Sequence, residues 1–249
     1  MAFVFASAPN WFLAPDVIIN AFSFLVLLAF FILCINNYKI NKNKGILYLG
    51  IGFGLISIAQ LAIFLTKFVI YYNTTFTTYI GTLIIKYNIV DSTSTLYNLS
   101  FFFNRVFTLL GLYVIYRLPN KKKSATDLIL VSYFIILSVF ISNQAYYLFH
   151  ATAMILFMLI AYNYYSIYRK NKFSNTKILA ISFGILALSQ LLPIVSTNNI
   201  VDVASNLIEL ISYVILLILI VRLKYGKKKK SDGYYIRHAK YHPGKSNRY

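Results

Sequence analysis

The chain has little charge, and few of its charged residues are acidic. Only 12% of its 249 residues are Asp, Glu, Lys or Arg, whereas 59% are hydrophobic. Soluble domains have roughly 25% charged residues. The 24 basic residues outnumber the 6 acidic ones, which gives a net charge of +18 at pH 7. This composition does not fit a soluble globular domain, and it places the basic excess between apolar segments or near a terminus.

Cysteine and histidine are too scarce for most metal and redox chemistry. The single cysteine, Cys34, excludes an intramolecular disulfide, a cysteine-based zinc site and a CxxC redox pair. His150 is the one histidine near an apolar segment, because His238 and His242 lie in the basic C-terminal region. A haem held by two histidines is therefore excluded, and we expect no cofactor and no metal site.

The residues that hydrolytic catalysis needs are also scarce. One glutamate within an apolar segment, Glu209, and one nearby histidine do not make a paired-carboxylate, metal or nucleophile–base site. The chain has no GxxxxGK[ST] phosphate-binding loop, and residues 201–222 contain no lysine for a retinal Schiff base. The sequence predicts no catalytic residue, and we expect a protein that is not an enzyme.

Long apolar runs are abundant. A helix that crosses a bilayer core needs roughly 20 apolar residues. The length and continuity of the runs favour helices over the alternating strands of a membrane barrel. We predict an all-α, multi-pass protein of the cell membrane, with a transmembrane domain over residues 17–222. The seven predicted helices are residues 17–37, 46–68, 97–117, 126–143, 146–168, 178–197 and 201–222.

The distribution of cations predicts the orientation. Lys and Arg near helix ends stay on the cytoplasmic side, and they gather in residues 39–44, 117–123 and 169–177 and in the C-terminal tail. We therefore expect residues 1–16 to form a short outer segment and the C-terminus to be cytoplasmic. The longest outer connection, residues 73–96, is rich in Thr, Ser, Asn and Tyr and is predicted to be a polar loop.

Two stretches repeat one pattern, "FGLISIAQL" from Phe53 and "FGILALSQL" from Phe183, and each follows a basic inner loop. Their glycines, Gly54 and Gly184, are expected at close helix contacts, as small residues are in membranes. The match predicts a parallel 3+1+3 repeat, although convergence of apolar sequences remains an alternative. The halves would cover residues 17–117 and 146–222, joined by a linker helix over 126–143.

Four polar residues are expected at one depth in the membrane. Each lies about seven or eight residues from the outer end of its helix, which corresponds to roughly 10 to 12 Å. A lone charge at that depth is costly, so each should face the interior and find a partner. We expect Arg105 and Glu209 to pair across the two halves. This predicted polar layer consists of Gln60, Arg105, Gln190 and Glu209.

The polar layer has two interpretations that the sequence leaves open. It is either a closed clasp between helices or a pocket between the halves, where parallel-repeat transporters place their substrate. Aligning Arg117 with Arg222 would make Asn104 the counterpart of Glu209. Four further side chains are predicted at the mouth of such a pocket, namely Asn20, Asn98, His150 and Asn206.

The C-terminal tail, residues 223–249, is basic and poor in aliphatic residues, and we predict that it is disordered. Its cations suit anionic lipid headgroups on the inner leaflet or a cytoplasmic protein partner. Interleaved Tyr, His and Lys also leave nucleic acid or the ribosome open as a partner. The expected contact residues are Lys227, Lys228, Lys229, Lys230, Arg237 and Lys240.

The predicted layout is similar to that of SWEET sugar transporters, microbial rhodopsins and the seven-helix sensor modules of prokaryotic signalling proteins. The resemblance is one of topology, since the PQ signature of the SWEET and PQ-loop families is absent: Gln60 follows Ala59 and Gln190 follows Ser189. We predict a non-catalytic sensor or partner-binding module that takes a small ligand or a protein. A small-solute transporter with its site between the halves is the alternative.

Overall fold

A computed structural model describes the backbone of residues 10–80, 83–117, 129, 130, 132, 133, 136, 146–196 and 198–239. It describes side chains within 11–69, 99–117, 147–196 and 198–223 and at 129, 130, 132, 133 and 136. Its elements are helical throughout this described part. A short 3-10 helix, Asn10–Phe12, precedes six α-helices. The helices are α1 (Leu13–Asn41), α2 (Lys44–Ile80), α3 (Leu83–Arg117), α5 (Tyr146–Asn171), α6 (Ser174–Val195) and α7 (Asn199–Ala239).

All six helices contain a segment long and apolar enough to cross a membrane, between 19 and 28 residues in length. Their outer surfaces carry large apolar side chains, such as Ile51, Ile58 and Leu65 along α2, which are 37%, 50% and 51% exposed. An exposed apolar surface of this extent is stable against lipid rather than water. The protein is therefore a multi-pass helical protein in contact with a bilayer.

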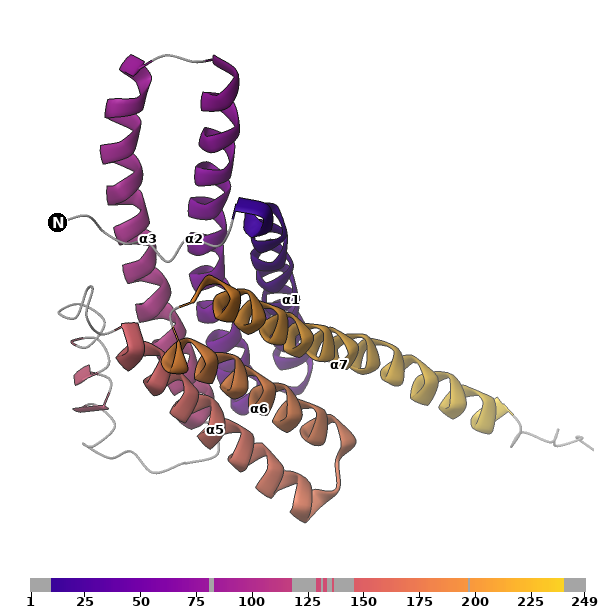
Figure 1. Ribbon diagram of the computed structural model, residues 1–249. Helices are drawn as coiled ribbons and strands as arrows, with labels where there is room; N and C mark the ends of the chain where they lie inside the picture. The colour runs from indigo at the N-terminus through magenta and orange to yellow at the C-terminus, as the bar shows by residue number, and fades with distance from the viewer. Residues whose placement is uncertain are drawn as a thin grey trace, which may run out of the picture.

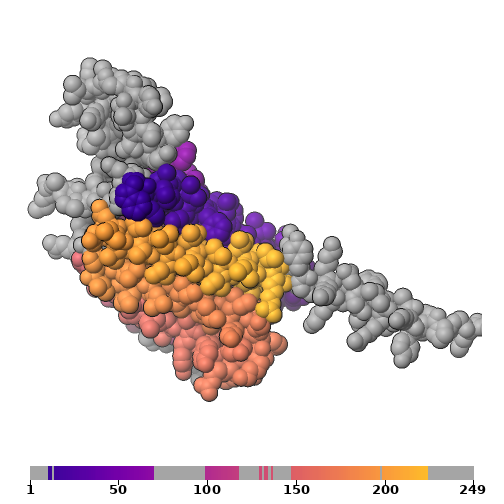
Figure 2. Space-filling model, turned by 45° about the vertical axis from the view of Figure 1, so that its right-hand side comes forward, coloured from indigo at the N-terminus to yellow at the C-terminus, as the bar shows by residue number. Residues whose placement is uncertain are grey.

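The helices form two groups of three that meet along two seams (Figure 1). Within each group, consecutive helices pack side by side: α1 on α2 on α3, and α5 on α6 on α7. Between the groups, α1 contacts α7 and α3 contacts α5, and we call these contacts the α1–α7 seam and the α3–α5 seam. Figure 2 shows α7 lying between α1 and α6 on one face of the molecule.

Aromatic rings fill the centre, where α2 meets α6. The rings of Phe53 and Phe183 stack with centroids 6.0 Å apart, and each residue is 1% exposed. Phe30 packs on Phe53 at 4.4 Å, and Phe157 and Tyr164 pack on Phe183 at 6.1 and 6.0 Å. This aromatic core joins both groups of helices.

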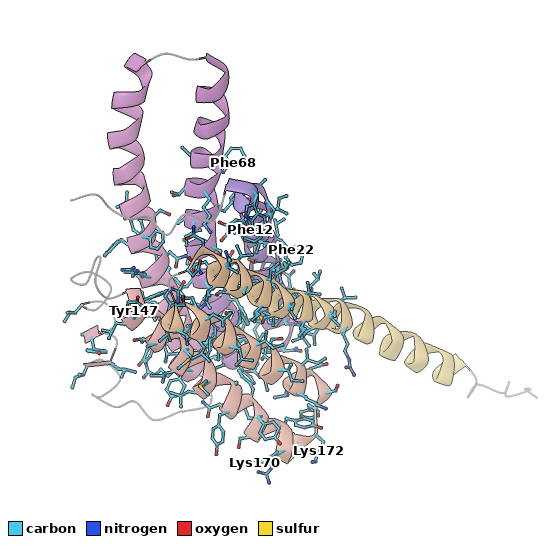
Figure 3. All side chains as sticks on the ribbon, viewed as in Figure 1. Phe12, Phe22, Phe68, Tyr147, Lys170 and Lys172 are labelled. Carbon is cyan, nitrogen blue, oxygen red and sulfur yellow. The ribbon has the colours of Figure 1, made fainter. Side chains whose placement is uncertain are left out.

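The two ends of the bundle differ in charge. The turns after α1 and α5 carry lysines, including Lys42 and Lys172, and we call this the basic end. Figure 3 places Lys170 and Lys172 at this end and Phe12 and Phe68 toward the other. The opposite end holds the buried Asp16, and we call it the acidic end.

The predicted polar loop over residues 73–96 is wrong, because helices occupy most of it. The α2 helix continues to Ile80, and α3 begins at Leu83. The two helices rise together beyond the rest of the bundle in Figure 1. No Gly or Pro interrupts residues 69–80, and a helix that is already nucleated elongates at little cost even through residues of modest propensity.

The basic tail also differs from its prediction. The α7 helix continues through residue 223 to Ala239, where the sequence predicted disorder. Lys and Arg are good helix formers, and the transmembrane part of α7 supplies the nucleus. Residues 240–249, the segment before residue 10 and most of the predicted fourth helix, 126–143, lie outside the described residues.

Helices α2 and α3 approach each other closely at Gly52 on α2 and Gly111 on α3. A Cβ atom on Gly52 would lie 2.9 Å from the carbonyl oxygen of Gly111, and one on Gly111 would lie 2.7 Å from that of Gly52. On Gly54 it would lie 3.0 Å from the ring of Phe31, as expected for a contact glycine. The expectation for Gly184 is wrong, since a Cβ there would meet no described atom within 4 Å.

We expect Gly111→Ala to destabilise the protein by ~1–3 kcal/mol, because the backbones of α2 and α3 must separate to admit the methyl group. Gly184→Ala is the matched control and should be neutral or stabilising, since alanine favours a helix by about 1 kcal/mol. Thermal unfolding in detergent measures both. A Gly111→Ala variant that melts with the wild type would contradict the α2–α3 contact.

Candidate functional site

Polar side chains cluster between the acidic end and the aromatic core. On α2, Lys67, Gln60 and Phe53 are spaced by seven residues, so they share a face at successive depths about 10 Å apart. On α7, Asn206 and Glu209 lie on the face that contains Tyr213. The α1–α7 seam thus passes from charged to amide to aromatic side chains on its way inward.

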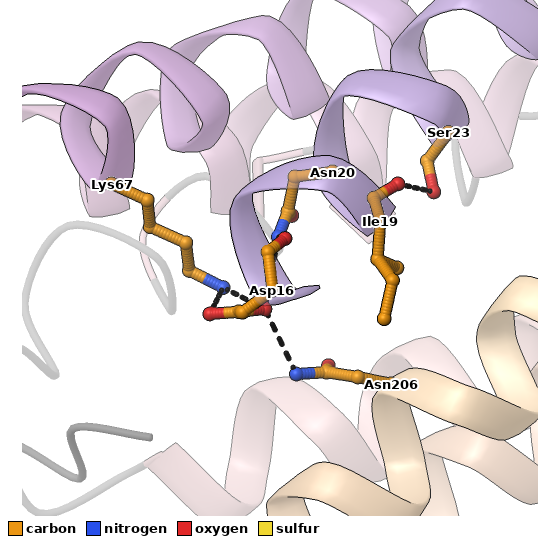
Figure 4. A network of polar contacts seen from close by, with 6 residues as sticks. All are labelled: Asp16, Ile19, Asn20, Ser23, Lys67 and Asn206. Atoms are coloured by element: carbon orange, nitrogen blue, oxygen red, sulfur yellow. Dashed lines mark hydrogen bonds and ion pairs between the residues drawn. The ribbon is translucent and has the colours of Figure 1, made fainter. Parts of the chain in front are cut away.

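The outermost cluster is built around Asp16, whose side chain is only 4% exposed (Figure 4). The ammonium of Lys67 lies 2.7 Å from Asp16 Oδ2 and 2.9 Å from Oδ1. The amides of Asn20 and Asn206 each donate to Oδ1 at 3.1 Å. We call these four residues the Asp16 clasp. It joins α1, α2 and α7, so two of the predicted mouth residues, Asn20 and Asn206, are engaged by one carboxylate.

A second cluster lies deeper along the same face of α7 and joins α7 to α2. Gln60 Nε2 on α2 donates to Glu209 Oε1 at 3.2 Å and to the Tyr213 hydroxyl oxygen at 3.4 Å. The Tyr213 hydroxyl in turn donates to Glu209 Oε1 at 2.8 Å. We call Gln60, Glu209 and Tyr213 the Gln60 triad. It brings together two residues of the predicted polar layer.

The predicted ion pair between Arg105 and Glu209 is not formed. Glu209 accepts its hydrogen bonds from Gln60 and Tyr213. The guanidinium carbon of Arg105 lies 5.6 Å from the ring centroid of Phe101 and 5.7 Å from that of Phe149. Arg105 therefore faces the α3–α5 seam and Glu209 faces the α1–α7 seam.

The remaining layer residue, Gln190, binds His150. The His150 Nδ1 and Gln190 Oε1 atoms are 2.7 Å apart, and since an amide oxygen only accepts, Nδ1 carries the hydrogen. His150 follows Phe149, the residue whose ring contacts Arg105. The predicted single layer is therefore two clusters, the Gln60 triad on one seam and a cationic cluster of Arg105, His150 and Gln190 near the other.

Short polar side chains also connect neighbouring helices through backbone carbonyls. Asn104 and Ser100 on α3 donate to the carbonyls of Ala59 and Ala62 on α2. Ser205 and Ser212 on α7 donate to the carbonyls of Ser189 and Ser182 on α6, both at 2.8 Å. These bonds satisfy groups that hydrocarbon would leave unpaired.

Several predicted site residues cannot be placed by their side chains. Asn98 lies in α3, and Lys227 to Lys230 and Arg237 lie in α7, but their side chains are outside the described residues, as is all of Lys240. In the described part of the chain, no three His, Cys, Asp or Glu residues are grouped as a metal site would need.

Sequence reasoning missed three members of the clusters, Asp16, Lys67 and Tyr213. It places Asp16 in the outer N-terminal segment and treats Tyr213 as an apolar residue of its helix. For Tyr213 the available signal is its spacing of four residues from Glu209, which places both on one face. For Asp16 the signal is an acid and a base, Lys67, at the predicted outer ends of neighbouring helices.

Comparisons with models of protein families, with curated proteins and with solved structures give no match.

A double-mutant cycle tests the assignment of Glu209. Gln60→Leu and Glu209→Leu should be coupled by about 0.5–3 kcal/mol, as residues in one hydrogen-bond network are. Arg105→Leu and Glu209→Leu should be additive within about 0.5 kcal/mol, because they lie on different seams. Unfolding of the single and double variants in detergent gives both values, and strong coupling of Arg105 to Glu209 would contradict the described geometry.

Proposed function

We propose that the chain is a non-catalytic membrane module made of two related three-helix halves, with a ligand-binding polar layer that faces the outside. The observation that carries this proposal is the position of the polar clusters. The Asp16 clasp and the Gln60 triad join the two halves, and the His150–Gln190 pair lies next to the Arg105–Phe149 contact of the α3–α5 seam. All of them lie between the acidic end and a packed aromatic core.

The positions of matching residues support two related halves. The turns after α1 and α5 are built alike: Lys42 and Lys172, 130 positions apart, have positive φ angles of 51° and 54°. The exposed row of α2 has its counterpart at the same spacing on α6, in Ile181, Leu188 and Val195. Ile18, Leu25 and Ile32 of α1 likewise correspond to Leu148, Ile155 and Tyr162 of α5, which are all exposed.

The third helices of the two halves, α3 and α7, can be aligned by the hydrogen bonds that they donate to the second helices. Asn104 and Ser205 donate to Ala59 and Ser189, which are 130 positions apart. This makes Asn104 the counterpart of Ser205. The alignment of Arg117 with Arg222 made it the counterpart of Glu209, so the two alignments differ by one helical turn. In this register Arg105 matches Asn206.

The seams support a pseudo-two-fold relation between the halves. The first helix of each half contacts the third helix of the other, as α1 does α7 and α5 does α3. The matching residues Phe53 and Phe183 stack on each other, as counterparts at a two-fold axis would. Gln60 and Gln190 then mark the same position in two binding clusters of different charge.

The direction of the helices supports a seventh crossing and an orientation. The turns that carry Lys42 and Lys172 lie at the basic end, so α2 starts there, α3 returns toward it, and α5 ends there. We therefore propose that the connection over residues 118–145, which contains the predicted linker helix, crosses from the basic end to the acidic end. The lysine-rich basic end is placed in the cytoplasm, so the N-terminus is outside and the C-terminus inside.

The aromatic core favours binding over transport. Phe53 and Phe183 are each 1% exposed, so a solute that entered from the acidic end would meet packed rings beyond the amide layer. A small-solute transporter with its site between the halves is the second candidate, because polar residues lie on both seams, and it requires these rings to separate.

Cysteine accessibility distinguishes binding from transport without a known ligand. Gln190→Cys is placed in a Cys34→Ala background, since Cys34 is buried and is the one native thiol. A membrane-impermeant thiol reagent is then applied to either side of reconstituted vesicles. Ser174→Cys at the basic end is the control for sidedness.

A binding module predicts labelling of Gln190→Cys from the outer face alone. Labelling from both faces would favour the transporter. No labelling from either side would mean a closed clasp and would overturn the proposed outer layer.

For the basic extension of α7 we propose contact with anionic headgroups. Each cation near such a surface contributes about 1 kcal/mol. Hydrogen exchange of residues 224–239 should be slower in nanodiscs with phosphatidylglycerol than in nanodiscs of phosphatidylcholine alone. Replacement of Lys227 to Lys230 by glutamine should remove the difference, whereas equal exchange of the wild type in both lipids would direct the search to a cytoplasmic protein or nucleic acid.

A further inference from the structure

We propose that the Asp16 clasp is a gate at the outer end of the α1–α7 seam, which controls access to the Gln60 triad behind it. The inference rests on the proposed function in one respect, namely that the polar layer is reached from the acidic end.

The clasp lies directly outward of the triad on the helices that they share. On α2, Lys67 is two turns from Gln60, which corresponds to about 10 Å along the axis. On α7, Asn206 is one turn from Glu209 and on the same face. A molecule that approaches the triad along the seam therefore meets the clasp first.

The clasp holds the two halves together at this end. The hydrogen bond from Asn206 Nδ2 to Asp16 Oδ1, 3.1 Å long, joins α7 of one half to α1 of the other. Lys67 reaches the same carboxylate from α2 within the first half. Separation of α1 from α7 must break the Asn206 bond, and the ammonium determines whether Asp16 remains in place to accept it.

The exposure of the two charges indicates which one moves. The Lys67 side chain is 26% exposed, whereas the Asp16 side chain is 4% exposed. A lysine ammonium on a flexible stem can exchange a partner for water, but a buried carboxylate that loses its partner is strongly destabilised. The closed state is thus held by Lys67 and is released when Lys67 leaves.

The gate belongs to one seam alone. At the matching positions of the other half, 130 residues on, the sequence has Tyr146 in place of Asp16 and Thr197 in place of Lys67. These residue types cannot form an ion pair. Any access along the α3–α5 seam is therefore controlled by different chemistry, and only the α1–α7 seam depends on this charge pair.

Thiol accessibility behind the clasp tests the gate. Gln60→Cys in the Cys34→Ala background is labelled from the outer face with an impermeant reagent, with and without Lys67→Met. Methionine keeps an unbranched side chain but lacks the charge. The labelling rate should rise about tenfold or more, because loss of a charge-assisted hydrogen bond shifts an opening equilibrium by at least that factor.

Two controls separate gating from general loosening. Lys172→Met removes a lysine at the basic end and should leave the rate unchanged. Gln190→Cys, near the other seam, should label at the same rate with and without Lys67→Met. If both cysteines label faster after Lys67→Met, the bundle is loosened as a whole and the gate is overturned.

A charge swap tests the pair itself. Asp16→Lys combined with Lys67→Asp restores an ion pair, and the labelling rate of Gln60→Cys should return toward that of the closed protein. Asp16→Asn, which retains the shape and the acceptor oxygen, replaces Lys67→Met if that variant does not fold. An unchanged Gln60→Cys rate in both single variants would overturn the gate, whereas the proposed outer layer would still be decided by Gln190→Cys alone.

Discussion

Hydrocarbon offers no hydrogen-bond partners, and the arrangement of this bundle follows from that constraint. A polar group between the spans must find its partner on a neighbouring helix or on its own backbone. Ser205 and Ser212 bond to carbonyls of α6 at 2.8 Å, and these bonds fix how far α7 is shifted along α6. The Gln60 triad and the Asp16 clasp obey the same rule at larger scale, each joining α7 to the first half of the chain.

The sequence predicted the six membrane helices that the structure describes and the common level of Gln60 and Glu209, but not which seam each polar residue faces. Depth is counted along one helix from its end, so Gln60 and Glu209 were expected at the same level, and they meet. The direction of a side chain around the helix depends on which helices pack beside it, which no single segment encodes. Depth alone therefore pairs Arg105 with Glu209, although Arg105 lies against Phe149 at the other seam.

Helix ends were the least predictable feature, for a related reason. Composition marked residues 73–96 as a polar loop because they are rich in Thr, Ser, Asn and Tyr, and residues 223–249 as a disordered tail because they are basic and poor in aliphatic side chains. Yet α2 extends to Ile80 and α7 to Ala239. A helix that lipid and packing have already nucleated adds further turns cheaply, so its end depends on what stops it rather than on where its apolar surface ends.

The proposed relation between the halves separates residues that maintain the fold from residues that have diverged. Phe53 and Phe183 keep the same identity and stack at the centre, and Gln60 and Gln190 keep the same amide. Their neighbours differ. The first half has Arg105 where the second half has Asn206, and it has Asp16 where the second half has Tyr146. A shared scaffold tolerates such exchange only if each new charge gains a local partner. The differing charges of the two clusters are therefore where distinct binding and gating roles would reside.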